Sequence, residues 1–259
     1  MKKLCTILFV LAAFLSTHAN NIQVSNITVS GADISFNIQW DNSWNTASNI
    51  NPLYPNNHDG AWVFIKYQNA IDNLWKHAVL STNAADHTIA GGVLEINTVP
   101  DGMGVFIRRS SAGFGNIAST SVTLKMNTLT GTGTFNYKVF GAEMVYVPAG
   151  AYEIGDRTGG GAVYTSKQTI GTTQQTTGIA AGALYKGSPA IPASFPMGVN
   201  AFYSMKYEIS CEQWVDFLNT LNYDQQVSRI GFNTPQSPVG TAVYTSAASG
   251  VSYIRTIRI

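Results

Sequence analysis

The chain has 259 residues, which is enough for one large domain or two ordinary ones. Apolar residues make up 45% and charged residues only 11%, so the composition excludes wholesale disorder, a coiled coil and a polytopic membrane protein. The formal charge is +1, which leaves no basic field to attract nucleic acid or anionic lipid. Low charge combined with 24 Gly, 12 Tyr and 12 Phe indicates a β-rich protein of the exported kind.

The amino terminus has the features of an export signal. Lys2 and Lys3 precede an apolar run over residues 4–15, and the small residue Ala19 follows. This order predicts a signal peptide over residues 1–19, cleaved after Ala19. The run is shorter than the roughly 20 apolar residues of a membrane-spanning helix, so no span is expected after cleavage. We therefore expect a protein that is secreted, periplasmic or on the cell surface.

The first half of the mature chain has the pattern of short strands joined by turns. Four apolar residues alternate with polar ones between residues 34 and 40, which indicates a strand with one buried face. The further strands expected are Ala61–Tyr67, Leu74–Leu80, Val93–Thr98, Gly104–Arg109, Ser121–Met126 and Thr134–Phe140. Many short strands without a convincing helix predict an antiparallel β-sandwich over residues 20–142, with an immunoglobulin-like or fibronectin-like topology.

The segment Asp41–Gly60 is rich in Asn, Ser and Pro and is expected to form one long loop. Its Trp44 and Tyr54 are the candidate ligand-binding residues of the sandwich, because exposed aromatic rings stack on sugars. Aspartates in the expected loops, Asp59 among them, lack the dense spacing of a calcium loop and are expected to form turns.

The sequence provides no catalytic or metal-ligating constellation that we recognise. His58, His77 and His87 have no His-x-His spacing, and all three are expected on the surface. Arg108 and Arg109 end a strand and are expected to face solvent. We therefore predict no catalytic residue, no metal ligand and no cofactor-binding residue in this chain.

The second half begins with a strand over Met144–Gly150. A stretch over residues 156–188, dominated by Gly, Thr and Gln, is expected to be an insertion or a long surface loop. An aromatic strand over Phe202–Ile209 then leads into a helix over Cys211–Leu221. Ser210 and Gln213 form a capping box at its start. The apolar stripe of this helix is Trp214, Phe217, Leu218 and Leu221.

The two motifs of this half resemble a known family. Met144–Gly150 with Ile154-Gly155, followed by Phe202–Ser210 running into Gln213-Trp214, looks like the opening of the formylglycine-generating enzyme, or sulfatase-modifying factor, domain. The resemblance implies an irregular mixed α/β fold related to the C-type-lectin core. It also implies that secreted bacterial members with an extra amino-terminal β-sandwich are similar to the whole chain.

The resemblance further implies copper held by two cysteines near the carboxyl end, or non-haem iron in some relatives. Cys211 is the only cysteine beyond the expected signal peptide and stands at a helix start that does not match the catalytic cysteines. The cysteine-bearing part of the family domain has no counterpart before Ile259, so an incomplete domain is expected over residues 143–259.

These observations leave three hypotheses. The first is a secreted protein whose incomplete family-like domain is non-catalytic and acts as a scaffold or interaction module. The second is a truncated copy of a copper or non-haem-iron oxidase, so whether the chain is an enzyme stays open. The third is a glycan-binding surface protein. The partner is then a protein or a glycan, and neither nucleic acid nor a membrane is expected.

Overall fold

The structure is a computed structural model, and it describes residues 21–46, 57–127, 129, 133–154, 168–184, 187–195, 197–230, 244–245 and 252–253. The expected signal peptide and Tyr54 lie outside the described residues, as does much of the expected insertion.

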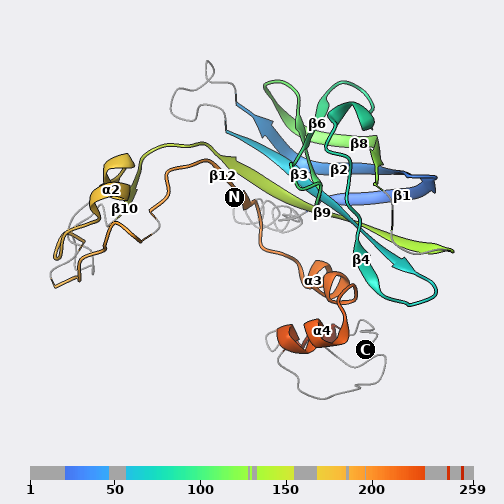
Figure 1. The fold of residues 1–259 in the computed structure, drawn as a ribbon. Coiled ribbons are helices and arrows are strands. Elements are labelled where there is room, and N and C mark those ends of the chain that lie inside the picture. The colour runs from blue at the N-terminus through green and yellow to red at the C-terminus, as the bar shows by residue number, and fades with distance from the viewer. Residues whose placement is uncertain are drawn as a thin grey trace, which may run out of the picture. The chain divides into compact units, whose positions relative to one another are not determined.

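The described part of the chain is mainly β (Figure 1). Its strands are β1 (Gln23–Ser30), β2 (Asp33–Asn45), β3 (His58–Asn69), β4 (Trp75–His77), β5 (Thr88–Ile89), β6 (Leu94–Thr98), β7 (Val105–Arg109), β8 (Gly113–Lys125), β9 (Phe135–Val147), β10 (Tyr152–Ile154), β11 (Gln168–Ile170), β12 (Phe202–Met205), β13 (Tyr244–Thr245) and β14 (Ser252–Tyr253). Its helices are the 3-10 turn η1 (Ala84–Asp86), α2 (Thr172–Thr177), α3 (Cys211–Leu218) and α4 (Tyr223–Ile230).

The main sheet has ten strands and an antiparallel character throughout its described pairings. Its strand order is β12-β9-β3-β2-β8-β5, with β1 also paired to β2, β4 and β7 paired to β3, and β6 paired to β7. A large antiparallel sheet is therefore confirmed.

The chain divides into two compact units. The first comprises residues 1–45, 59–144 and 205–259, and the second comprises residues 46–58 and 145–204. The chain passes from one unit to the other at the end of β2 and within β3, β9 and β12. The expected domain boundary at residues 142 and 143 falls inside β9.

The core of the first unit follows the alternation that the sequence predicts for β2. Ile34, Phe36, Ile38 and Trp40 are each no more than 1% exposed, while the residues between them are only half-buried. The inward residues of β3, β7 and β8 pack on the same cluster. Strand β2 therefore buries one face, because side chains alternate between the two faces of a strand.

Several expected elements differ from the observed ones. Thr134–Phe140 and Met144–Gly150, expected as two strands, belong largely to the single strand β9. The expected loop Asp41–Gly60 is shorter, since β2 continues to Asn45 and β3 begins at His58. Cross-strand hydrogen bonding overrides the loop-like composition there, because β2 pairs with β8 up to Asn45.

The second unit has a small apolar cluster of its own. Ile170, Ile179 and Met197 are buried together, and β10 pairs with β11 in antiparallel register. The expected insertion thus contains a strand and the short helix α2 where the composition indicates only a loop.

Candidate functional site

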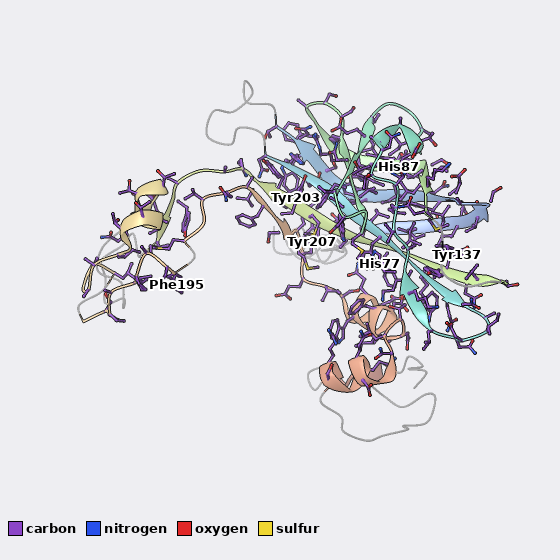
Figure 2. All side chains as sticks on the ribbon, in the orientation of Figure 1. His77, His87, Tyr137, Phe195, Tyr203 and Tyr207 are labelled. Carbon is purple, nitrogen blue, oxygen red and sulfur yellow. The ribbon has the colours of Figure 1, made fainter. Side chains whose placement is uncertain are left out.

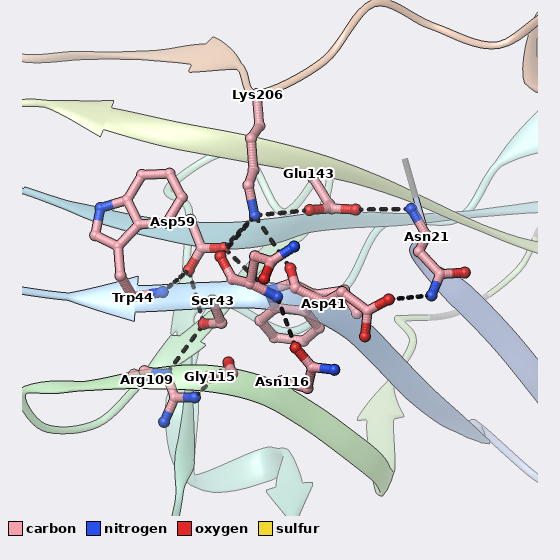
Figure 3. A network of polar contacts seen from close by, with 12 residues as sticks. Asn21, Asp41, Ser43, Trp44, Asp59, Arg109, Gly115, Asn116, Glu143 and Lys206 are labelled. Carbon is pink, nitrogen blue, oxygen red and sulfur yellow. Dashed lines mark hydrogen bonds and ion pairs between the residues drawn. The ribbon is translucent and has the colours of Figure 1, made fainter. Parts of the chain in front are cut away.

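The most unusual group in the first unit is a buried ionic cluster centred on Lys206. Its Nζ lies 3.0 Å from Asp59 Oδ2 and 3.0 Å from Glu143 Oε2 (Figure 3). The same nitrogen donates to the carbonyl oxygens of Asn42 at 3.0 Å and Asp41 at 3.3 Å. The side chains of Lys206, Asp59 and Glu143 are 5%, 0% and 2% exposed, so the cluster is closed to solvent.

Strand periodicity places Asp59 in this position. Asp59 is in phase with Ala61, Val63 and Ile65, all of which are fully buried on β3. Because side chains repeat every two residues along a strand, Asp59 also faces inward. The expectation that Asp59 forms a loop turn is therefore wrong, and the in-phase alternation from Asp59 was the signal that marked it as buried.

Asp59 is fully supplied with hydrogen-bond donors. Its Oδ1 accepts from Ser43 Oγ at 2.8 Å and from the Trp44 amide at 2.9 Å. Its Oδ2 accepts from Trp40 Nε1 at 3.1 Å and from Lys206 Nζ at 3.0 Å. A buried carboxylate is tolerated only when it is paired and hydrogen-bonded in this way.

Glu143 connects the cluster to neighbouring strands. Its Oε1 accepts from the Asn21 amide at 3.3 Å, and its carbonyl oxygen accepts from the Lys206 amide at 2.9 Å. Asn21 also donates through Nδ2 to Asp41 Oδ2. Lys206 is therefore held by both its backbone and its side chain next to β9.

The environment of Lys206 favours its charged form. Burial by itself lowers the pKa of Lys206, but the hydrogen bond and charge of Asp59, followed by those of Glu143, outweigh it and raise the pKa above its ordinary value. The ring of Trp44, whose centroid is 4.9 Å from Nζ, adds a cation–π contact. Lys206 is thus a fixed cation over the whole neutral range.

Both arginines that were expected to face solvent have protein partners. Arg109 Nε donates to Ser43 Oγ at 3.1 Å, and Ser43 in turn donates to Asp59. The Ser43 hydroxyl group therefore links Arg109, a second cation, to the ionic cluster. Arg108 Nη2 pairs with Glu95 Oε1 at 2.5 Å. Both residues end β7 as expected, but their side chains are half-buried because they bond to residues of neighbouring strands.

Of the two candidate ligand-binding residues, the structure describes Trp44. It lies at the end of β2, half-buried, with its ring beside Lys206 and its amide bonded to Asp59. Tyr54 is outside the described residues, so the structure does not test the pair. Glycan binding by these two residues stays a prediction.

The histidines are less exposed than expected, and Figure 2 labels His77 and His87. His87 is 7% exposed; its Nε2 lies 2.9 Å from the Ser81 carbonyl oxygen, and its Nδ1 accepts from the Lys125 amide at 3.1 Å. His58 is 8% exposed, with Nε2 3.0 Å from Tyr203 Oη and its ring stacked on Tyr146. The surface expectation is therefore wrong for both: His58 lies on β3, and His87 follows the turn η1, where both of its ring nitrogens contact backbone groups.

His77 is half-buried, and its ring also has protein partners. Its Nε2 lies 2.6 Å from the Met103 carbonyl oxygen, and its ring stacks on Phe64 at 5.7 Å between centroids. Within the described residues, no three His, Cys, Asp or Glu side chains gather in a group that could hold a metal ion.

The donor set does not fit the copper site that the resemblance implies. Cys211 is the first residue of α3 and the only thiol of the chain besides Cys5, which lies in the expected signal peptide. Copper(I) is selected by soft thiolate ligands, and one thiolate does not make the cysteine pair of the family. Cys211 alone therefore does not provide the copper site of that family.

Helix α3 begins as the sequence predicts. The Ser210 side chain accepts from the Gln213 amide at 3.1 Å, and Gln213 Oε1 accepts from the Ser210 amide at 3.0 Å, so the capping box is confirmed. The helix ends at Leu218, three residues before the expected end at Leu221. Val215 and Leu218 are the most buried residues of the helix, whereas Trp214 and Phe217 are half-buried.

Helix α4 was not predicted. Its start is capped reciprocally, since the Gln225 amide donates to Asn222 Oδ1 at 2.9 Å and the Asn222 amide donates to Gln225 Oε1 at 3.2 Å. An Asn followed three residues later by Gln is the signal that could have found it.

No family model, no curated protein and no solved structure matches this chain. In the described part of the chain, no helix is long and apolar enough to cross a membrane.

Proposed function

We propose that the chain is a secreted protein in which a β-sheet body carries a segment similar to the opening of the formylglycine-generating enzyme domain. In this proposal the segment is a non-catalytic scaffold or interaction module. The amino-terminal sandwich, the lectin-like continuation and export to the periplasm, cell surface or medium belong to the same proposal.

The burial and the contacts of Lys206 are the observation that supports the proposal best. Lys206 lies within the motif Phe202–Ser210, one of the two motifs on which the resemblance rests. Its ammonium group donates to three protein oxygens, forms an ion pair with Glu143 and is 5% exposed, so no substrate reaches it without displacing those contacts. A charged group closed in this way positions a segment and does not react.

The contacts on either side of Lys206 favour the same function. Before it, the chain lies at the edge of the sheet in β12, and after it the capping box starts α3. The ion pair thus fixes the point at which the chain leaves the sheet and enters the helix. A fixed connection between the sheet and α3 suits a module that presents a surface to a partner.

An oxygen-consumption assay tests the proposal. The full chain is mixed with copper and a cysteine-containing sulfatase peptide, and its melting temperature is measured with and without copper. We expect no sustained oxygen uptake and no copper-dependent rise in melting temperature, since a ligand stabilises a protein only when it binds the folded state. Sustained turnover, or a rise in melting temperature that Cys211→Ser abolishes, would contradict the proposal.

A further inference from the structure

A cavity separate from the ionic cluster lies on the other face of β3. It has a volume of about 730 Å³, which is within the size range of small-ligand sites. It is lined by residues of β3, β4 and β9 and by residues of α4 and of the connection from α3 to α4. All of its lining residues belong to the first unit.

Pairing in the β3–β4 hairpin aligns three of the lining side chains. Gln68 pairs with Trp75, and Lys66 is two residues from Gln68 on β3. Residues directly opposite one another, and residues two apart on one strand, share a face of the sheet. Lys66, Gln68 and Trp75 therefore face the cavity together, away from the core that Tyr67 enters.

Lys66 is a cation without a carboxylate partner in the described part of the chain. Its Nζ donates to the Thr220 carbonyl oxygen at 3.3 Å and lies 5.9 Å from the centre of the Phe217 ring. Burial lowers the pKa of Lys66, which means that the folded protein holds its charge at a cost. An anion in the cavity would offset that cost.

A second cation lines the same cavity. Lys138 on β9 lies 3.7 Å from Asp216 Oδ1, and both side chains are about one-third exposed. Such an exposed and long ion pair contributes little in water, so an incoming anion competes for Lys138 at small cost. Lys76 also lines the cavity, but its Nζ is 2.8 Å from Asp72 Oδ2.

The rest of the lining is dominated by carboxamides and one indole ring. Asn222 and Gln225 use their side-chain oxygens to cap α4, which leaves their NH₂ groups as donors at the cavity wall. Carboxamide groups both donate and accept hydrogen bonds, and the neighbouring hydroxyl groups of a sugar ring need partners of both kinds. Trp75 supplies a flat apolar surface of the kind on which a pyranose ring stacks.

We propose that this cavity binds an acidic saccharide, with its carboxylate or sulfate group held by Lys66 and Lys138 and its ring against Trp75. Carboxylate and sulfate share the required chemistry, and the experiment distinguishes the two sources. The site is independent of the Lys206 cluster, so its failure would leave the proposed function untouched.

Isothermal titration of the full chain tests the site with a heparin-derived tetrasaccharide, a galacturonate tetramer and neutral cellotetraose. AMP and inorganic sulfate are titrated for comparison. We expect one or both acidic sugars to bind and the neutral one to bind at least about tenfold more weakly, which corresponds to about 1.4 kcal/mol. Lys66→Gln and Trp75→Ala should each weaken binding by a similar factor. Lys125→Gln, which removes an exposed lysine on β8, is the matched control and should change nothing.

Added salt should weaken binding, because exposed charges are screened. In protein labelled with carbon-13 at the lysine Cε methylene groups, the pKa of Lys66 should rise when the acidic sugar binds. This second readout keeps the test meaningful if Trp75→Ala impairs folding.

Four outcomes would overturn the proposal. They are no binding of either acidic sugar, equal binding of the neutral sugar, unchanged affinity in Lys66→Gln, and tighter binding of AMP or inorganic sulfate than of the saccharides. The last outcome would indicate a nucleotide or a simple anion site instead.

Discussion

Replacing Lys206 by Met is the most informative perturbation of the ionic cluster. Met keeps an unbranched apolar stem of similar length and removes the charge. Asp59 and Glu143 would then remain as two carboxylates that are 0% and 2% exposed with no cation between them. Removing one partner from a buried ion pair costs about 3–5 kcal/mol, because the other charge is left uncompensated.

That cost is large compared with the total stability of a domain, which is about 5–15 kcal/mol. For a domain of roughly 150–250 residues, a loss of 1 kcal/mol lowers the melting temperature by about 2–4 °C. We therefore expect Lys206→Met to lower it by roughly 6–20 °C, as measured by thermal and urea unfolding followed by circular dichroism.

The matched control is Lys125→Met, because Lys125 is an exposed lysine on β8, and it should change stability little. The double variant Lys206→Met/Asp59→Asn should be more stable than the sum of the single changes predicts, since the second change removes the uncompensated charge. A loss below about 1 kcal/mol in Lys206→Met, or strict additivity in the double variant, would refute the reasoning, because either result is typical of an exposed ion pair.

Further predictions concern other parts of the chain. Ser210→Ala should lower the free energy of unfolding by about 1 kcal/mol, because the Gln213 amide loses its cap; Ser228→Ala, inside α4, is the control in the same urea titrations. The raised pKa of Lys206 means that its stabilising contribution is complete below about pH 10.4 and is lost as pH rises through the folded-state value. Alkaline unfolding should therefore be steeper in the wild type than in Lys206→Met, and equal slopes would count against the assignment. Leu218→Ala should cost about 2–5 kcal/mol in the same measurements, because Leu218 is 0% exposed. Amino-terminal sequencing of the exported protein should begin at Asn20, and an intact Met1 would contradict the expected signal peptide.

The local features of the fold could be predicted from the sequence. Alternation over Ile34–Trp40 predicts the buried face of β2, and the Ser210–Gln213 pair predicts the start of α3, because both depend on neighbours a few residues apart. Turn formation by aspartate is equally local: the amide of Leu74 donates to Asp72 Oδ1 at 3.0 Å, as expected of a turn residue.

The candidate site could not be predicted in the same way. Lys206 and Asp59 are 147 residues apart, and no periodicity connects residues across such a distance. What the sequence did contain was an aspartate in phase with the buried residues of β3, and a buried aspartate requires a cation or several donors. That observation predicts that a partner exists without saying which residue it is.

Native-state hydrogen exchange of the full chain tests most directly whether Lys206 anchors the segment that leads into α3. The Lys206 amide, bonded to the Glu143 carbonyl oxygen, and the amides of α3 should exchange slowly in the wild type. In Lys206→Met, exchange should become much faster at these amides while the amides of β2 keep more of their protection. Fast exchange of the same segment in the wild type, or an unchanged pattern in the variant, would contradict the account.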